Sequence, residues 1–308
     1  MAVSPDSSPE LNPLSLGDLK YQYGDNDSDR GSRNGDRDVD AIAPLPEYKA
    51  AGETIVDFDG LLKPAPDLRL REDLSEGCGG QTWPAGLVLG KHMLRYRRAE
   101  MANARILELG AGGGLTGLGV ALANQAASDA KGECPPAEPR MYITDQEMML
   151  SLMKHNIVLN GLEREAKALV LNWGEPLPEE VRTLRPNIIL AADCVYFEPA
   201  FPLLLTTLED LLSIDDEATP QEDQMVIYFC FKKRRRADNQ FLKKAQKKFC
   251  LTEVFDEERP VFSRENLFLY TITRKPAKTA NGNANGSTNG NGTKRVVKTN
   301  SNETRQQQ

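Results

Sequence analysis

The sequence predicts an α/β protein built on a doubly wound, mostly parallel sheet of seven strands. Between about residues 51 and 275, short apolar stretches alternate with longer amphipathic ones, which is typical of an open parallel sheet covered by helices. A glycine-rich turn follows the first apolar stretch of this alternation. The last two strand-like stretches follow each other closely, which indicates an antiparallel pair at one edge of the sheet.

The expected elements can be placed in order along the chain. Residues 52–71 alternate apolar and polar residues and predict a small β-element ahead of the sheet. Strands are expected at 105–109, 140–144, 168–171, 187–192, 225–231, 251–255 and 266–273, and helices at 84–96, 115–127, 145–160, 201–212 and 237–249. Residues 128–139 carry three prolines and are expected to form a loose loop.

The two ends of the chain differ in composition from the part between them. Residues 1–50 are rich in Ser, Asp, Gly and Pro, and residues 276–308 are a low-complexity Asn/Gly/Thr/Lys/Gln sequence. Such segments bury too little apolar surface to offset the entropy of ordering them, so we expect two disordered tails. Residues 51–275 are therefore expected to form one folded domain.

Composition narrows the classes of protein to consider. The folded part is mildly acidic, which argues against a nonspecific nucleic-acid binder. Five scattered cysteines without a C-x-x-C pair indicate reduced thiols in a cytoplasmic protein, and two histidines argue against a histidine-based metal site. No apolar stretch resembles a signal peptide or a membrane span. We therefore expect a monomer with no metal, membrane or nucleic-acid partner.

The glycine-rich turn follows the first strand of the expected sheet and reads Glu108-Leu-Gly-Ala-Gly-Gly-Gly114. Glycine lets a nucleoside-bearing cofactor approach the backbone closely, because it has no Cβ. A dinucleotide fingerprint can be placed on Gly112, Gly114 and Gly117, but that register begins too late for the turn and leaves Glu108 and Gly110 without a role. The register that begins at Gly110 is typical of enzymes that use S-adenosyl-L-methionine.

Two residues that follow the next strands fit the same cofactor. Asp145 comes after the strand expected at 140–144, where a carboxylate can accept both ribose hydroxyls. Its alternative role is an N-cap of the following helix. Trp173 follows the third strand of the sheet and can stack on an adenine ring, although an ordinary core position is the commoner place for tryptophan. With the glycine turn beside them, we favour cofactor binding for both.

The segment Ala192-Asp-Cys-Val-Tyr196 ends the fourth strand of the sheet, opposite the glycine turn. The transferred group must meet its acceptor at this edge. Asp193 would be costly to bury unless it is paired or functional, and a helix cap is its alternative role. Upstream, Trp83 precedes Pro84 in a glycine-flanked segment. It can fold over the cofactor as a lid, or simply mark the entry to a helix.

A basic run, Lys232-Lys-Arg-Arg-Arg236, follows the fifth strand of the sheet. It can be a nuclear-localisation signal, a nucleic-acid patch or a contact for an acidic substrate surface, since it is expected at the cofactor edge. A solvated loop that leads into the following basic helix explains it equally well. We assign no nucleic-acid binding from this run.

Taken together and in order, these motifs resemble one family. Trp83 before a helix, Glu108–Gly114, Thr144-Asp145, Leu171-Asn-Trp-Gly174 and Asp193-Cys-Val-Tyr196 are similar to the motifs of the methyltransferase-like family 21 protein-lysine methyltransferases. The resemblance covers about residues 50–275. It implies a seven-stranded, Rossmann-like methyltransferase fold and methyl transfer from S-adenosyl-L-methionine to a lysine side chain, with translation elongation factor 1-alpha as the protein substrate.

The resemblance also implies roles for individual residues. The cofactor would be bound by Trp83, Glu108, Gly110, Ala111, Gly112, Asp145, Trp173 and Ala192. Asp193 and Tyr196 would line the acceptor pocket as catalytic residues, with Asp193 orienting the amine and receiving its proton. Two alternatives on the same fold are a small-molecule or nucleic-acid methyltransferase and a catalytically silent binding module. The first is disfavoured because the segment after the fourth strand lacks an Asn-Pro-Pro-Tyr-like run, and the second because Asp145, Trp173 and Asp193 are all present.

Overall fold

The computed structural model describes residues 51–75, 77–134, 136–214 and 224–276. The tails predicted at 1–50 and 276–308 lie outside these ranges, apart from Pro276. Within the described ranges, no helix is long and apolar enough to cross a membrane.

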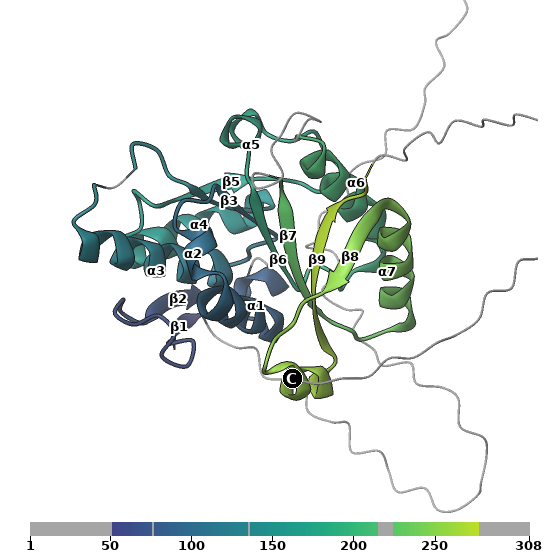
Figure 1. Ribbon diagram of the computed structural model, residues 1–308, viewed down its shortest axis with the longest axis horizontal. Coiled ribbons are helices and arrows are strands. Elements are labelled where there is room, and N and C mark those ends of the chain that lie inside the picture. The colour runs from purple at the N-terminus through teal and green to yellow at the C-terminus, as the bar shows by residue number, and fades with distance from the viewer. Residues whose placement is uncertain (1–50, 76, 135, 215–223, 277–308) are drawn as a thin grey trace, which may run out of the picture. The chain divides into compact units, whose positions relative to one another are not determined.

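The central sheet has seven strands in the order β5-β4-β3-β6-β7-β9-β8 (Figure 1). All neighbouring strands are parallel except for β9, which pairs antiparallel with β7 and β8. The predicted seven-stranded sheet with an antiparallel final pair is therefore confirmed. The strands are β3 (Ile106–Leu109), β4 (Met141–Asp145), β5 (Ala166–Val170), β6 (Ile188–Ala192), β7 (Val226–Lys232), β8 (Phe249–Glu253) and β9 (Leu267–Arg274).

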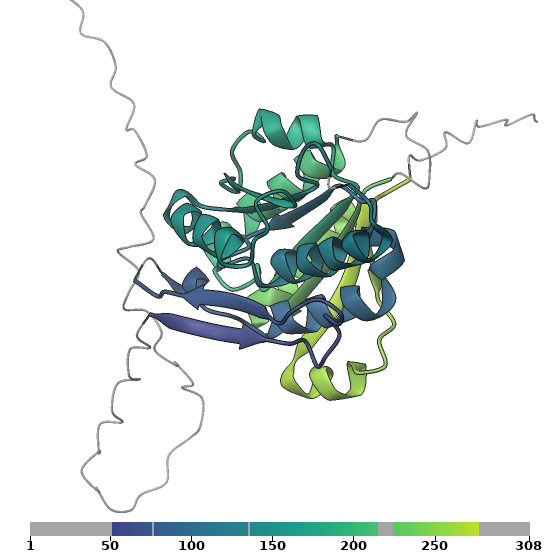
Figure 2. The same cartoon turned by 90° about the vertical axis from the view of Figure 1, so that its left-hand side faces the viewer.

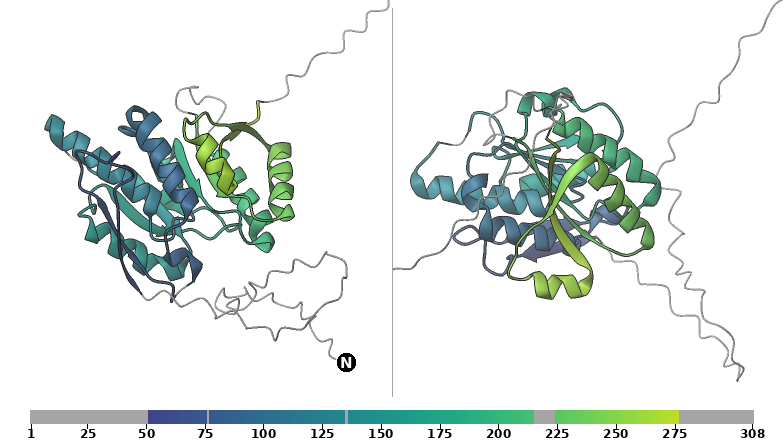
Figure 3. Two further views of the ribbon diagram at one scale, coloured as in Figure 1. Left: turned by 90° about the horizontal axis from the view of Figure 1, so that it is seen from below. Right: turned by 45° about the vertical axis from the view of Figure 1, so that its right-hand side comes forward.

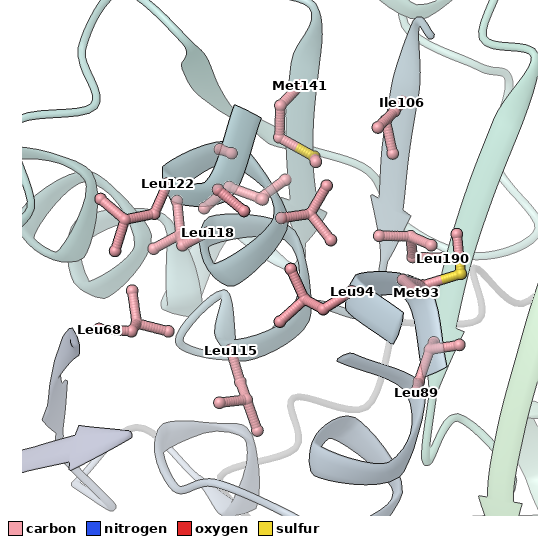
Figure 4. Close-up of a cluster of buried hydrophobic side chains, with 14 of the residues drawn as sticks. Leu68, Leu89, Met93, Leu94, Ile106, Leu115, Leu118, Leu122, Met141 and Leu190 are labelled. Atoms are coloured by element: carbon pink, nitrogen blue, oxygen red, sulfur yellow. The ribbon is translucent and has the colours of Figure 1, made fainter. Parts of the chain in front are cut away.

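Helices cover both faces of the sheet, because successive residues of each strand point to opposite sides. One face packs against α1 (Pro84–Tyr96), α3 (Leu115–Lys131) and α4 (Glu147–Leu159), and Figure 4 shows part of the resulting core. The other face packs against α5 (Glu179–Leu184), α6 (Phe201–Leu212) and α7 (Arg236–Lys248), as two further views illustrate (Figure 3). The short helix α2 (Arg98–Met101) lies between α1 and β3, and the short helix α8 (Arg259–Phe262) lies between β8 and β9.

The small β-element predicted ahead of the sheet is an antiparallel ribbon of β1 (Gly52–Val56) and β2 (Leu68–Glu72), which is seen along one side of the fold in Figure 2. Two asparagines about one turn apart, one in α4 and one at its C-cap, bind the free edge of β2. The amide oxygens of Asn156 and Asn160 accept the backbone N–H groups of Arg71 and Arg69 at 2.8 and 2.9 Å. These bonds replace the missing third strand of the ribbon.

Most predicted boundaries shift by one or two residues, and two larger differences from the sequence prediction concern helices. The helix expected to end at 127 continues to Lys131, because residues 128–131 contain neither glycine nor proline and Gly132 then ends the helix with a left-handed φ of 67°. The loop prediction for 128–139 is thus wrong for its first four residues. Helix α5 was not predicted, because its six residues are too few to show a helical period.

Candidate active site

A cavity of 540 Å³ lies at the carboxyl ends of β3, β4 and β6, within the range of about 300–1,000 Å³ typical of small-molecule sites. This is the edge where ligands bind in doubly wound folds. The ten predicted site residues, which come from five segments of the chain, all line it. They are Trp83, Glu108, Gly110, Ala111, Gly112, Asp145, Trp173, Ala192, Asp193 and Tyr196.

The glycine turn begins directly after β3, as the register starting at Gly110 requires. Gly110, Gly112 and Gly114 have left-handed φ values of 65°, 54° and 87°. A Cβ on Gly112 would lie 2.3 Å from the carbonyl oxygen of Gly79, and one on Gly110 would lie 3.1 Å from the ring of Trp173. These close approaches explain why glycine stands at both positions.

Glu108 lies under this turn and is buried within the fold. Its carboxylate accepts the backbone N–H of Gly117 at 2.9 Å, in the first turn of α3. Burial raises the pKa of Glu108 to about 8, although hydrogen bonds from Gly117 and Thr116 oppose this rise. The contact shows that Glu108 braces the start of α3 as well as lining the cavity.

Asp145 is the last residue of β4 and holds the glycine turn in place. Its two carboxylate oxygens accept the N–H groups of Gly112 and Gln146, each at 2.7 Å. Gln146, not Asp145, occupies the N-cap position of α4, and the cap makes no side-chain hydrogen bond. Burial raises the pKa of Asp145 against these two bonds. The helix-cap alternative is therefore wrong, and the carboxylate keeps lone pairs that can accept further hydroxyl groups.

Two tryptophans stand on different sides of the cavity. Trp173 is half-buried and packs over Gly110, so it is not an ordinary core residue. Trp83 is the N-cap of α1, with Pro84 in the first turn, and its ring Nε1 donates to the carbonyl oxygen of Cys78 at 2.9 Å. The helix-entry interpretation of Trp83 is correct, and the same residue lines the cavity. Its action as a lid remains a prediction.

The segment 77–83 that carries Trp83 is anchored to the end of β2. One carboxylate oxygen of Glu72 accepts both the N–H and the hydroxyl of Thr82, at 2.7 and 2.9 Å. The carbonyl oxygen of Gly80 accepts the N–H of Asp73 at 2.8 Å. The small β-ribbon thereby positions one wall of the cavity against the glycine turn.

Asp193 follows β6 in a left-handed conformation with a φ of 55° and is 8% exposed. Its two oxygens accept hydrogen bonds from Nη1 and Nη2 of Arg234 at 2.9 and 2.6 Å. The backbone N–H of Lys232 also donates to it, at 3.2 Å. The next helical turn begins only at Glu198, so the helix-cap alternative is wrong for Asp193.

Tyr196 is half-buried at the same end of the cavity, and its hydroxyl lies near the thiol of Cys78. Burial raises the pKa of the Tyr196 hydroxyl well above its ordinary value, so the hydroxyl keeps its proton at neutral pH. It can thus donate or accept a hydrogen bond as a neutral group. Burial likewise raises the pKa of the Cys78 thiol.

Arg234 and Cys78 also line the cavity, although the sequence motifs do not single them out. Three side chains of the basic run are engaged, contrary to a merely solvated loop: Arg234 binds Asp193, Arg235 donates to the carbonyl oxygen of Tyr196, and Lys233 lies over the ring of Phe268. For Arg234, the signal in the sequence is the position of the basic run directly after the fifth strand of the sheet, at the cofactor edge. For Cys78, the signal was its place beside the glycines that precede Trp83.

The chain is similar in sequence to known proteins of one family. Residues 62–248 match the model of a family described as lysine methyltransferase. The protein-lysine N-methyltransferase EFM6 of Saccharomyces cerevisiae is 35% identical over 77% of this chain and 96% of its own length. The protein N-lysine methyltransferase METTL21A of Danio rerio is 31% identical over 63% of this chain and 80% of its own length.

Proposed function

Because the chain belongs to the lysine methyltransferase family, we propose that it methylates a lysine of translation elongation factor 1-alpha in the cytoplasm, acting as a monomer. Membership of the family makes the chain an S-adenosyl-L-methionine-dependent protein-lysine N-methyltransferase. The choice of elongation factor is supported by the motifs that run from Trp83 to Tyr196 and by the similarity to EFM6 along nearly its whole length.

The residues of the cavity fit this cofactor. The glycine turn offers backbone that a Cβ would block, and Asp145 offers carboxylate lone pairs in the cavity wall. We assign Asp145 to the ribose hydroxyls, the turn from Gly110 to Gly112 to the backbone contact, and Trp173 to the adenine ring. Trp83 and Ala192 line the same cavity and complete the set. When bound, S-adenosyl-L-methionine supplies a methyl group carried on a positively charged sulfur.

The remaining residues prepare the acceptor lysine. The carboxylate of Asp193 has about four lone pairs, and three of these positions accept hydrogen bonds from Lys232 and Arg234. One position is left to orient an amine. We therefore assign Asp193 to orientation and not to receiving the proton. Tyr196, which stays neutral, gives the channel an uncharged wall and favours the unprotonated amine by excluding water.

The observation that carries this proposal is that the ten predicted site residues, Asp145 and Asp193 among them, line one cavity of a chain that matches the lysine methyltransferase family. The test incubates the purified full chain with radiolabelled S-adenosyl-L-methionine and purified elongation factor 1-alpha, and mass spectrometry then locates the label. We expect label on one lysine. D193A should abolish transfer and retain most cofactor affinity, because its contact is made mainly with the substrate. Label on another protein of a cell lysate, with none on the elongation factor, would contradict the substrate.

A further inference from the structure

Arg234 is the residue of the acceptor site whose presence the proposed function does not explain. Its guanidinium binds both oxygens of Asp193 in a fork, at 2.9 and 2.6 Å. Such bidentate pairs are the strongest and most directional that a carboxylate makes. The side chain of Asp193 is 6% exposed and that of Arg234 is 25% exposed, so solvent screens the pair weakly.

Two further contacts hold the guanidinium at the mouth of the cavity. Its carbon lies 5.6 Å from the centre of the Trp83 ring, in the range of a cation–π contact. Its Nη1 also donates to the carbonyl oxygen of Lys232 at 3.2 Å. Arg234 therefore joins the wall that carries Trp83 to the strand end that carries Asp193, and its position does not depend on one bond.

Other titratable groups also lie around the cavity, and most of those near Asp193 are neutral or bound elsewhere. Burial raises the pKa of Cys78, Cys194 and Tyr196, which keeps all three neutral. Arg235 lies near Asp238 of α7, 3.8 Å away. Lys232 stands beside Arg234 in the chain, and the cavity is also lined by the carboxyls of Glu108 and Asp145, whose pKa values burial raises. The other charged lining residues have partners of their own: Glu72 binds Thr82, Glu175 accepts from Asn172, and Arg71 pairs with Asp73.

We propose that Arg234 is a positioning residue that neutralises Asp193, so that the acceptor lysine meets an ion pair without net charge. A lone carboxylate at this place would favour the ammonium form, which has no lone pair to attack with. With Arg234 in place, the ammonium releases its proton to solvent water and the nitrogen keeps the electron pair. This inference rests on the proposed function, because it requires a lysine in this cavity.

The test measures the single-turnover rate of methyl transfer to the acceptor protein against pH, between about 6 and 10. In R234Q we expect the acid limb of the profile to move up by about 1 unit or more, the effect of one charge within about 4–6 Å. The rate then falls about tenfold near pH 7 and recovers at high pH. R234K, which keeps the charge, should move the limb much less.

Two comparisons separate this role from a structural one. R236Q removes the same charge from an exposed position of the basic run and should leave the limb where it is in the wild type. The double variant D193N/R234Q has no charge at either position and, unlike D193A, keeps an amide oxygen that can orient the amine. Its limb should therefore return to the wild-type pH, with a lower rate. Melting temperature and cofactor affinity are measured for each variant to establish that it is folded.

A rate that falls by the same factor at every pH in R234Q would overturn the inference, because it would show that Arg234 only holds Asp193 in place. An equal shift in R236Q would also overturn it, since the effect would then belong to the run as a whole. Failure of the proposed function would look different, because the wild type would then transfer no methyl group to the elongation factor at any pH.

Discussion

Replacing Asp145 tests the cofactor site, because this carboxylate holds the glycine turn and lies at the cavity. D145A removes an acceptor for the N–H of Gly112 and the acceptor proposed for the ribose. Hydrogen bonds to a charged group are worth about 1.5–3 kcal/mol. We therefore expect the affinity for S-adenosyl-L-methionine to fall by about 10- to 150-fold.

Part of this loss would come from a loosened turn, and D145N separates the two effects. An amide keeps one acceptor oxygen for Gly112 and loses the charge. We expect D145N to melt near the wild-type temperature and still to lose affinity, whereas D145A should melt lower by a few degrees, for about 1–2 kcal/mol of lost stability.

The assay is calorimetric titration of the full chain with S-adenosyl-L-methionine, beside thermal unfolding without ligand. E147A serves as the control, because it removes an exposed carboxylate two residues away that is not part of the cavity wall. Wild-type affinity in both Asp145 variants would refute the ribose assignment. An equal loss in E147A would show that general charge, not this carboxylate, attracts the ligand.

Three further predictions concern other parts of the molecule. G112A should weaken cofactor binding more than G132A does, because both positions have left-handed φ but only the first places a Cβ against Gly79; titration of both variants decides this. Glu108, with its pKa raised from 4.5 to about 8, is protonated in both states below pH 4.5, so the stability it contributes is complete there and is lost as pH rises through about 8. E108Q should lack that decline, on the order of 4 kcal/mol, and denaturant unfolding at pH 5 and pH 8.5 measures it. A shortened chain of residues 48–276 should melt within a few degrees of the full chain and methylate the same target. Any loss of rate should be confined to low salt, since the positive C-terminal tail can speed encounter with an acidic partner. If the shortened chain is inactive at every salt concentration, a tail docks on the domain.

Local sequence was sufficient wherever a contact lies within one strand–turn–helix unit. The turn from Gly110 to Gly114 is recognisable because its glycines follow an apolar strand at the correct spacing, and the structure gives each of Gly110, Gly112 and Gly114 a left-handed φ. Strand β6 ends at Ala192, which is also the end of the strand predicted at 187–192. In each case the signal is a change of period or a break at glycine, which neighbouring residues determine.

Contacts between segments that are distant in the sequence could not be predicted from local patterns of residue types. Asp193 and Arg234 are far apart in the chain and meet because β6 pairs with β7 in a register that sets Ala192 opposite Cys230. Gly79 meets Gly112 because the β-ribbon anchors residues 77–83 across the turn. A pattern of residue types does not state which strand ends become neighbours.

By itself, the sequence determined the fold class and the order of the main elements, because periodicity and turn chemistry are local properties of the chain. Its resemblance to a known family supplied the ten residues that line one cavity. Only the tertiary structure decided what those residues contact there. It paired Asp193 with Arg234, placed Glu108 under the start of α3 and gave Asp145 the N–H of Gly112. The physical reason is that burial, charge pairing and pKa depend on neighbours in space, which strand register and packing bring together.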